Sequence, residues 1–342
     1  MKAKIKPRYD INRQKLADII PLSTPFTILI EPTRYCNFKC FYCIHSTREE
    51  QRGAWSRYGY NLKHMEFEMY EKILCDITKF PERLKRVVFS GLGEPLMNPE
   101  LPKMVARARE LNIADRLDVV TNASLLTPEL SDALIEAGVT RIEISLQGLN
   151  SEKYKEVSKI NLNFEKFYEN LRYLYKHKGN CTIFVKIIDV LLDSKEDENR
   201  FYELFGEISD EIYVEHLIAA QQPMGNIRGL VDNSRNLNSE MVEFKRVCAV
   251  IFYSLQIDVD GNVFPCCALT LPKELIIGNV KEEGLVQIWN GKKRIDLIKK
   301  HLKFNRNLII GCSDCVAFMC ATPNDKNEYL DDVAGDLLKR FE

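Results

Sequence analysis

The stretch EPTRYCNFKCFYC, residues 31–43, decides how this chain is interpreted. It follows an apolar run, FTILI at 26–30, and it places Cys36, Cys40 and Cys43 in one short segment. Thiolates are soft ligands that suit zinc or the iron of iron–sulfur clusters. A structural zinc ion needs a fourth ligand, which His45 would supply, whereas a [4Fe–4S] cluster on three thiolates keeps one iron open. The segment therefore predicts a metal centre directly after the first strand.

Composition places the chain among ordinary soluble proteins. Its 342 residues include 48 Lys+Arg and 49 Asp+Glu, a formal charge of −1, and 45% are hydrophobic. A balanced charge argues against a nucleic-acid partner. No apolar run approaches the roughly 18 residues of a membrane span, and no secretion signal opens the sequence. We therefore expect a cytoplasmic protein, where the 11 cysteines indicate metal binding more than disulfides.

Short β-branched runs alternate with longer amphipathic stretches up to about residue 220. This alternation is typical of βαβ units around a parallel sheet, and six units predict an α/β fold with a partial (β/α)6 barrel. The expected strands begin at Phe26, Arg86, Leu117, Arg141, Thr182 and Glu211. The expected helices span 65–80, 99–111, 128–137, 150–177 and 195–206.

The rhythm breaks after Gln222, where PMGNIRG and DNSRNLNS are rich in turn residues. We therefore divide the chain into a barrel domain, 1–225, and a small cysteine-rich domain, 226–342. Alternation on both sides of Asp-Gly in SLQIDVDGNVFPC, residues 254–266, predicts a hairpin in the second domain. Helices are expected from about 284 to 301 and from about 327.

The first cysteine cluster resembles that of the radical S-adenosylmethionine (SAM) superfamily, which carries CxxxCxxC after the first strand with an aromatic residue before the last Cys. The resemblance implies that Cys36, Cys40 and Cys43 hold a [4Fe–4S] cluster whose open iron binds the amino and carboxylate groups of SAM. The reduced cluster would then cleave SAM to a 5′-deoxyadenosyl radical that abstracts hydrogen from a substrate. Tyr42 would lie near the adenine, or would simply pack.

Later strand ends carry further residues similar to those of the family. The sequence SGLGEP, 90–95, resembles the GGEP motif, which implies that Gly91, Gly93 and Glu94 hold the SAM amino group. Many relatives carry Asp where this chain has Gln147, and an amide only forms hydrogen bonds. The other expected SAM-binding residues are Asn122, Ser145 and Lys186, although Lys186 also fits a solvated strand position.

The second cluster of cysteines resembles the SPASM/twitch C-terminal domain of radical SAM enzymes. Converging thiolates suit either zinc or an iron–sulfur cluster. The number of cysteines suits one auxiliary [4Fe–4S] cluster, and Cys320 is an alternative ligand. Cys267 is left as a candidate unligated thiol. The expected ligands are Cys248, Cys266, Cys312 and Cys315.

These residues lead us to expect an oxidoreductase that dehydrogenates a small polar substrate: a carbohydrate, an aminocyclitol or a sugar nucleotide. The auxiliary cluster would accept the electron of the substrate radical. A redox-neutral epimerase with Cys267 as hydrogen donor is the first alternative. Maturation of a ribosomal peptide is the second, with only about 25 residues before the first strand to hold a leader-binding domain. A non-catalytic iron–sulfur carrier or zinc scaffold would need neither the GLGEP motif nor Ser145.

The sequence alone leaves two interpretations for each of two further sets of residues. The basic run GKKRIDLIKKHLKF from Gly291 fits a solvated helix face, or a docking patch for a flavodoxin- or ferredoxin-type reductant. Polar residues near strand ends fit either a substrate pocket or ordinary strand ends. These residues are Glu143, Gln147, Glu215 and His216.

Overall fold

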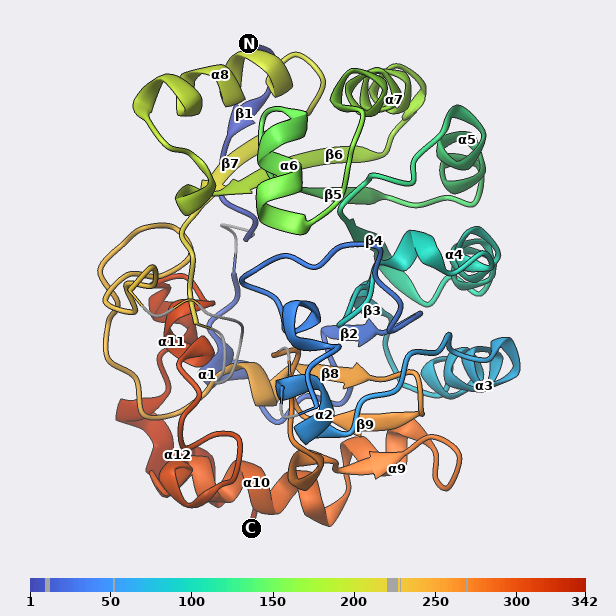
Figure 1. Ribbon diagram of the computed structural model, residues 1–342. Coiled ribbons are helices and arrows are strands. Elements are labelled where there is room, and N and C mark those ends of the chain that lie inside the picture. Colours follow the sequence, from blue (N-terminus) through green and yellow to red (C-terminus); the bar gives the residue numbers. More distant parts are fainter. Residues whose placement is uncertain (10–12, 52, 220–226, 228, 269) are drawn as a thin grey trace.

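One ten-stranded sheet runs through the computed structural model, in the order β1-β7-β6-β5-β4-β3-β2-β8-β9-β10 (Figure 1). The structure describes the chain except residues 10–12, 52, 220–226, 228 and 269. Strands β2 to β7 are mutually parallel, so the six predicted strands of the partial barrel are confirmed. They are β2 (Thr27–Ile30), β3 (Leu84–Phe89), β4 (Ala114–Thr121), β5 (Arg141–Leu146), β6 (Thr182–Ile188) and β7 (Glu211–Glu215).

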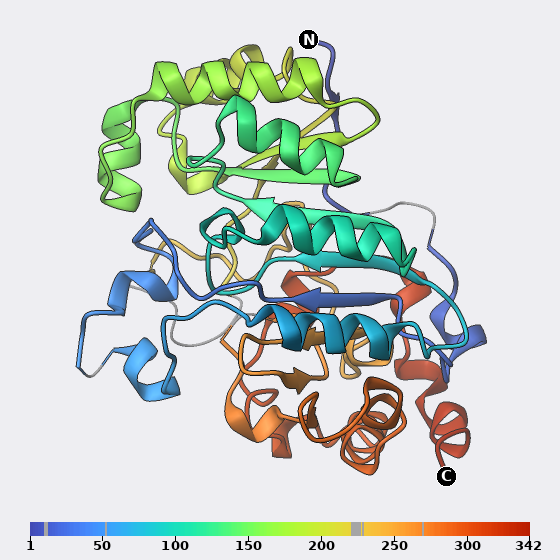
Figure 2. The same ribbon diagram turned by 90° about the vertical axis from the view of Figure 1, so that its right-hand side faces the viewer.

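Helices connect these strands and cover the outer face of the sheet, where they lie side by side (Figure 2). Each connection between two parallel strands therefore contains at least one helix, as a parallel pair requires. The helices are α3 (Phe67–Ile77), α4 (Leu101–Glu110), α5 (Pro128–Glu136), α6 (Ser151–Ser158), α7 (Phe164–His177) and α8 (Lys195–Phe205). The helix expected over 150–177 is thus two helices, because Lys159 ends α6 in a left-handed conformation at φ 62° and Asn163 caps α7.

The two faces of the sheet differ in chemistry because successive side chains on a strand alternate between them. Ile28, Val87 and Ile142 belong to the apolar core under the helices. The opposite face, called the inner face below, carries polar residues at the alternate positions. Register places Glu143 beside Phe184 and Ser145 beside Lys186 on this face. The inner face is therefore the side on which polar chemistry is available.

The C-terminal part continues the same sheet. Strand β8 (Ser254–Ile257) pairs in parallel with β2, and the predicted hairpin is confirmed as β8 and β9 (Asn262–Phe264). Strand β10 (Gly278–Asn279) follows, while β1 (Lys4–Ile5) adds the other edge beside β7. Of the two turn-rich stretches expected as the linker, PMGNIRG at 223–229 lies largely outside the described residues, and DNSRNLNS at 232–239 is described. The division of the chain at 225 stays a prediction.

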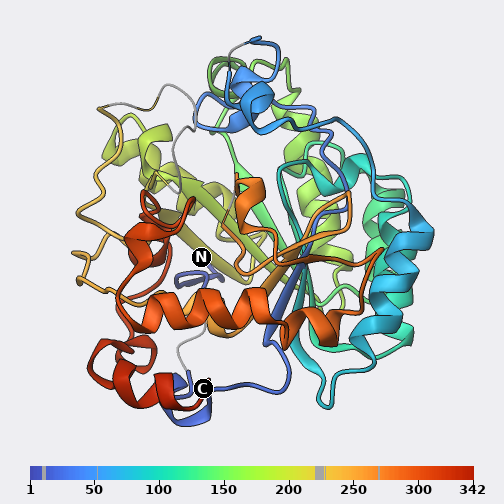
Figure 3. The same cartoon turned by 90° about the horizontal axis from the view of Figure 1, so that it is seen from below.

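Short helices complete the chain, and α10 lies lengthwise across one side of the molecule (Figure 3). The helix expected over 284–301 is broken after Trp289, and Gly291 caps a second helix. The helix expected from 327 is a 3₁₀ turn followed later by α12. No described helix is long and apolar enough to cross a membrane. The remaining helices are α1 (Leu16–Ile19), α2 (Ala54–Tyr58), α9 (Leu285–Trp289), α10 (Lys292–Leu302), α11 (Ala317–Cys320) and α12 (Ala334–Lys339).

Candidate functional site

The loop that carries the first three cysteines is fixed to the end of α6. The backbone N–H of Lys39 donates to Ser158 O at 2.9 Å, and that of Phe41 donates to Val157 O at 3.1 Å. Phe38 is buried and meets the ring of Tyr154 edge-on at 6.1 Å between centroids. The loop is therefore held by main-chain bonds and packing, independently of any ligand on its thiols.

The three thiols of this loop gather in one place, with Cys40 buried and Cys36 and Cys43 half-buried. Burial, together with the charges of Cys43 and Glu94, raises the pKa of Cys36 to about 12, although a backbone N–H and Arg48 oppose the shift. Burial, followed by the neighbouring Cys43 and Cys36, also raises the pKa of Cys40. Buried thiols with raised pKa values lose their protons readily only to a metal, because metal binding requires the thiolate. Their donor chemistry fits an iron–sulfur cluster.

His45 is not available as a fourth ligand. Its Nε2 lies 2.9 Å from Leu92 O, and its Nδ1 lies 3.3 Å from Nη1 of Arg48. Burial, with the charge of Arg48, lowers the pKa of His45 to about 4, so the ring is neutral and Nε2 donates to the carbonyl. Both ring nitrogens thus have protein partners, which removes the specific support for zinc in this loop.

Among the described residues, no three His, Cys, Asp or Glu side chains converge closely enough to hold a single metal ion. Thiolates of an iron–sulfur cluster bind different irons, so they surround a volume and do not converge on one point. The gathering of Cys36, Cys40 and Cys43 without such convergence is compatible with a cluster site.

The SGLGEP loop packs against the start of the cysteine loop. A Cβ on Gly93 would stand 2.2 Å from Thr33 O and 2.7 Å from Tyr35 O, and one on Gly91 would stand 2.6 Å from Cγ of Glu31. The backbone N–H of Leu92 donates to Oε1 of Glu31 at 2.7 Å. Glycine at both positions thus permits the close approach of two loops at the expected SAM site.

Glu94 forms hydrogen bonds with the chain after β3 and at the end of β4. Its buried carboxylate accepts hydrogen bonds from the N–H of Leu96 at 3.0 Å, the hydroxyl of Thr121 at 2.5 Å and the N–H of Asn122 at 2.7 Å. Burial raises the pKa of Glu94 to about 7, although these three donors oppose the shift. The carboxylate is therefore engaged by the protein itself, and a contact with the amino group of SAM stays a prediction.

Gln147 connects Tyr42 of the cysteine loop to Ser145 at the end of β5. The hydroxyl of Tyr42 donates to Oε1 of Gln147, and the thiol of Cys40 lies 3.6 Å from the same oxygen. Nε2 of Gln147 donates to Ser145 O at 3.1 Å. The Gln that departs from the family pattern thus links the end of β5 to the expected cluster ligand Cys40.

Two further expected SAM-binding residues have different surroundings. Asn122 donates from Nδ2 to Oδ1 of Asn37, inside the cysteine loop, at 3.0 Å. Lys186 instead forms an ion pair with Glu215 at 2.6 Å, and its side chain is 14% exposed. Asn122 therefore lies at the cysteine loop, whereas Lys186 is a half-buried, paired residue and not a solvated strand lysine.

Four of the C-terminal cysteines also come together, whereas Cys320 lies at their margin. Burial, and then the charges of Cys315 and Cys312, raises the pKa of Cys248. Burial raises the pKa of Cys266 too, with Cys248 and Cys312 among its charged neighbours. Cys320 interacts with Cys315 but also lies 3.5 Å from Asn233 O. The structure thus gathers the four expected ligands and leaves Cys320 at their margin.

Cys267, adjacent to Cys266, faces other neighbours. Its charge acts on Arg8, Tyr9 and Tyr253, so its thiol lies within electrostatic reach of the N-terminal segment. Arg8 forms an ion pair with Glu143 of β5 at 2.9 Å on the inner face. Sequence reasoning missed Arg8 and Tyr9, because no motif marks the segment that follows β1.

Arg34, inside the first motif, was also missed. Its Nε donates to Glu31 at 3.1 Å, its Nη1 to Asp260 at 2.8 Å and its Nη2 to Asp258 at 2.9 Å. Arg34 and Glu31 are buried, and the two aspartates belong to the Asp-Gly turn of the C-terminal hairpin. We call this set the Arg34 junction, defined as Arg34, Glu31, Asp258 and Asp260. It joins the cysteine loop to the C-terminal hairpin.

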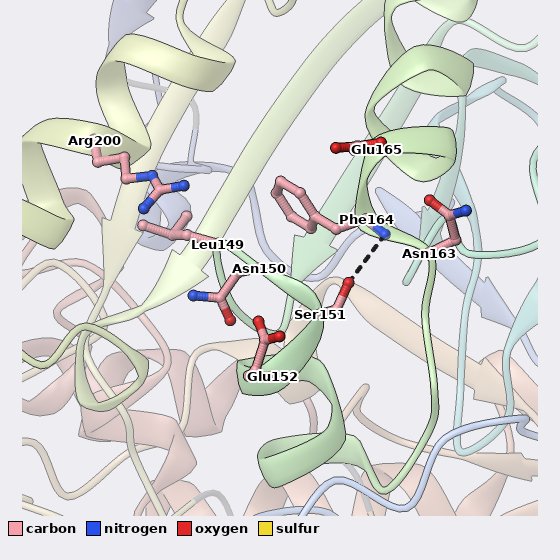
Figure 4. Close-up of a pocket in the computed structure, with 8 residues that line it drawn as sticks. All are labelled: Leu149, Asn150, Ser151, Glu152, Asn163, Phe164, Glu165 and Arg200. Atoms are coloured by element: carbon pink, nitrogen blue, oxygen red, sulfur yellow. Dashed lines mark hydrogen bonds between the residues drawn. The ribbon is translucent and has the colours of Figure 1, made fainter.

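A surface pocket of about 470 Å³ lies at the N-termini of α6 and α7 (Figure 4). Asn150 and Asn163 cap these helices, and Glu152 and Glu165 occupy their first turns. Carboxylates there already complement the positive ends of the helix dipoles. The pocket contains none of the expected site residues, so we do not assign the chemistry to it.

Two known families match the chain, one over each of the two cysteine clusters. The radical SAM superfamily matches residues 30–204, just over half of the chain. The SPASM iron–sulfur cluster-binding domain matches residues 248–316. The first match contains all three cysteines of the N-terminal loop, and the second contains Cys248, Cys266, Cys267, Cys312 and Cys315.

Two curated proteins illustrate the similarity in sequence. The tungsten-containing aldehyde ferredoxin oxidoreductase cofactor-modifying protein of Pyrococcus furiosus is 25% identical over 317 residues, covering 78% of this chain and 81% of that protein. A probable GTP 3′,8-cyclase of Methanococcus vannielii is 35% identical over 133 residues, 39% of each chain. This chain therefore aligns with most of the first protein but with only about two fifths of the second.

Solved structures show the same fold at low identity. BtrN in complex with AdoMet and 2-DOIA has a TM-score of 0.52 and 19% identity, covering 85% of this chain and 92% of BtrN. SuiB of Streptococcus suis bound to the precursor peptide SuiA has a TM-score of 0.60 and 18% identity, covering 81% of this chain and 67% of SuiB. At these identities the similarity establishes a common fold, a partial barrel with a SPASM domain.

Proposed function

The chain belongs to the radical SAM superfamily, and from this we propose that it is an oxidoreductase that dehydrogenates a small polar substrate. The substrate class is a carbohydrate, an aminocyclitol or a sugar nucleotide, and the reacting group is an alcohol carbon. The substrate gives one hydrogen atom to the 5′-deoxyadenosyl radical, then one proton to a base and one electron to an auxiliary cluster. The product is a carbonyl compound lighter by two hydrogens.

The radical SAM domain implies a [4Fe–4S] cluster and SAM, and the SPASM domain implies auxiliary iron–sulfur clusters. When bound, these groups supply the 5′-deoxyadenosyl radical and an acceptor for the substrate electron. We propose Cys36, Cys40 and Cys43 as ligands of the first cluster. For the auxiliary cluster we propose Cys248, Cys266, Cys312 and Cys315.

One observation supports the oxidative reading: Cys248 and Cys266 lie on either side of the β8–β9 hairpin, whose strand β8 pairs directly with β2, and both interact with Cys312. The cysteine loop follows β2, so both thiol groups are built on neighbouring strands of one sheet. An electron acceptor near the reacting carbon is what an oxidation needs and what a redox-neutral reaction does not.

The other residues of the proposed SAM site hold its loops together and orient its side chains. Gly91 and Gly93 let the SGLGEP loop lie against the cysteine loop, and Asn122 ties the end of β4 to it. Gln147, fixed between Tyr42 and Ser145, offers hydrogen bonds but no carboxylate. A proton acceptor for the oxidative step must therefore come from elsewhere on the inner face.

The deciding measurement is anaerobic iron and sulfide quantitation with EPR on the reconstituted enzyme and on a Cys36/Cys40/Cys43→Ala variant. Two [4Fe–4S] clusters predict about eight iron atoms in the first protein and about four in the second. About four and none would contradict the electron-acceptor role. Substrate candidates are then screened for 5′-deoxyadenosine formation and for a product lighter by two hydrogens.

A second function is favoured by Cys267, whose thiol lies within electrostatic reach of Arg8 and Tyr9 as well as of Cys266. A cysteine in that place suits the return of a hydrogen atom to a substrate radical, which gives epimerisation. This reaction leaves the mass unchanged in H₂O, adds one deuterium in D₂O and stops in Cys267→Ala. With a dehydrogenase in the same assay, the substrate loses two hydrogens and the product carries no solvent deuterium at that carbon.

The names of the relatives widen the substrate screen. The Pyrococcus furiosus relative is named for modifying the cofactor of a tungsten-containing oxidoreductase, and SuiB was solved with a precursor peptide. A tungsten-enzyme cofactor and a peptide encoded nearby therefore join the sugars in the screen. A flavodoxin or ferredoxin supplies the reducing electron in these assays, in keeping with the reductant that we propose.

A further inference from the structure

The inner face carries a carboxylate with an unused oxygen. Glu215, the last residue of β7, has a side chain that is 5% exposed, and its Oε2 accepts from Nζ of Lys186 at 2.6 Å. Its other oxygen, Oε1, is buried and has no hydrogen-bond partner in the described part of the chain. A buried acceptor without a partner is costly, so such an atom marks a place where a ligand donor belongs.

The strand register places Glu215 at the end of the barrel where the chemistry is expected. Ser145 is level with Lys186, Lys186 is level with Tyr213, and Glu215 lies two residues beyond Tyr213 on the same face. Glu215 is thus at the carboxyl end of its strand, the end where α/β barrels bind substrates.

The N-terminal segment supplies the complementary donor. Arg8 uses Nε for its ion pair with Glu143, and 24% of its side chain is exposed, so its terminal nitrogens are open to a ligand. Glu215 acts electrostatically on both Arg8 and Tyr9, and so does Cys267. Acceptor, guanidinium and phenol therefore share one neighbourhood, bordered by the chain that carries the auxiliary thiols.

We propose that Glu215 and Arg8 form the substrate site and that it takes a polyol. One substrate hydroxyl donates to Oε1 of Glu215, and an adjacent oxygen accepts from the terminal nitrogens of Arg8. This deepens and rests on the proposed dehydrogenation: after hydrogen abstraction from the carbinol carbon, Glu215 takes the hydroxyl proton. An auxiliary cluster held by the C-terminal cysteines would, when bound, accept the remaining electron as the C=O bond forms. Glu215 supplies the proton acceptor that Gln147 cannot be.

The first test measures binding, without turnover, on the reconstituted enzyme with SAM and its clusters oxidised. Calorimetry gives dissociation constants for myo-inositol, glucosamine and glucose 1-phosphate. Arg8→Gln is expected to weaken binding of the preferred probe at least tenfold, because a charged hydrogen bond is lost. The control is Arg107→Gln, the same substitution at a guanidinium of α4 on the outer side of the sheet, which pairs with Glu71 at 3.1 Å. No binding of any probe, or equal loss in the control, would overturn the polyol assignment.

The second test separates hydrogen abstraction from proton removal. Glu215→Gln keeps a hydrogen-bond acceptor but loses the base, so 5′-deoxyadenosine still forms while carbonyl product per 5′-deoxyadenosine falls about 100-fold. A substrate radical should then accumulate in the EPR spectrum. An unchanged product ratio would overturn the role of Glu215. If the wild type binds the probe in an Arg8-dependent way but never forms a carbonyl, the site stands and the proposed dehydrogenation fails.

Discussion

At Gly93 a single methyl group would collide with two backbone carbonyls, 2.2 and 2.7 Å away. Backbone cannot rotate aside as a side chain can, so Gly93→Ala must push the SGLGEP loop from the cysteine loop. We expect SAM binding to weaken strongly and the free energy of unfolding to fall by about 1–3 kcal/mol. Calorimetry with SAM and urea unfolding measure the two effects.

Gly335→Ala is the matched control for that change. A Cβ at Gly335 meets nothing within 4 Å, and the residue lies in α12. Alanine in an open helical position is expected to be neutral or to stabilise by up to about 1 kcal/mol. If Gly93→Ala binds SAM as well as Gly335→Ala does, the proposed close approach is not required.

The contribution of His216 to the stability of the fold depends on pH. Burial lowers its pKa, but the hydrogen bond and charge of Asp189, 2.5 Å away, and the carbonyl of Asp232 raise it above its ordinary value of 6.5 overall. The folded protein thus binds this proton more tightly than the unfolded chain. The contribution to stability is complete below pH 6.5 and is lost as pH rises through the folded pKa.

We therefore expect His216→Gln to cost roughly 1.5 kcal/mol at pH 6 and much less at pH 9. Urea unfolding of the reconstituted enzyme at both pH values measures this difference. His177→Gln, at an exposed position of α7, is the control and should show no such trend. A cost of His216→Gln that is constant across this range would contradict the charged pair.

Sequence could identify the residue types at this scale but not their partners. The spacing of Cys36, Cys40 and Cys43 is local, so the motif was readable. His45 looked like a zinc ligand because its partners, Leu92 and Arg48, become neighbours only in the fold. Arg8 was invisible for the same reason, since it pairs with Glu143 more than 130 residues away.

At the scale of elements, the strands were predictable and the helix ends less so. Short β-branched runs between amphipathic stretches marked β2 to β7, because parallel strands covered by helices are rich in Val, Ile and Leu. Helix 150–177 was overextended because Lys159 in a left-handed conformation has no sequence signal, unlike glycine. The Asp-Gly turn of the hairpin was recognised, but its aspartates were not connected to Arg34.

The Arg34 junction makes a prediction about how two elements depend on each other. Arg34→Met leaves the buried carboxylates of Glu31 and Asp258 without their cation, and breaking a buried pair costs about 3–5 kcal/mol. Because the junction joins the cysteine loop to the hairpin, we expect iron to be lost from both proposed clusters. Iron quantitation and urea unfolding measure these effects.

Lys63→Ala is the control, since the side chain of Lys63 pairs at 3.0 Å with the partly exposed Asp260, at the rim of the junction. Its loss should cost less than about 1 kcal/mol. Burial already raises the pKa of Glu31 to about 7 against the charge of Arg34. Without Arg34 the folded state favours the protonated carboxyl more, so the cost of Arg34→Met should grow as pH rises. Full iron content in Arg34→Met would contradict the coupling.

At the scale of the whole molecule, two cysteine-bearing parts that look separable in sequence share one sheet. Composition changes near 225, yet β8 from the C-terminal part pairs along the whole of β2, from Thr27 to Ile30. Pairing of distant strands leaves no local trace in sequence, whereas a linker does. The sequence therefore predicts two parts while hiding the edge at which they join.

This continuity predicts that residues 1–225 will not behave as an independent domain. Removing β8 exposes an edge of β2 whose four residues are all buried in the intact chain, and such an apolar edge pairs with other copies. The removal also leaves Arg34 without Asp258 and Asp260. We expect the fragment to aggregate when made alone and to recover solubility and SAM binding when 226–342 is co-expressed. Size-exclusion chromatography with calorimetry decides the matter, because a monomeric 1–225 fragment that binds SAM as the full chain does would mean that the shared sheet is dispensable.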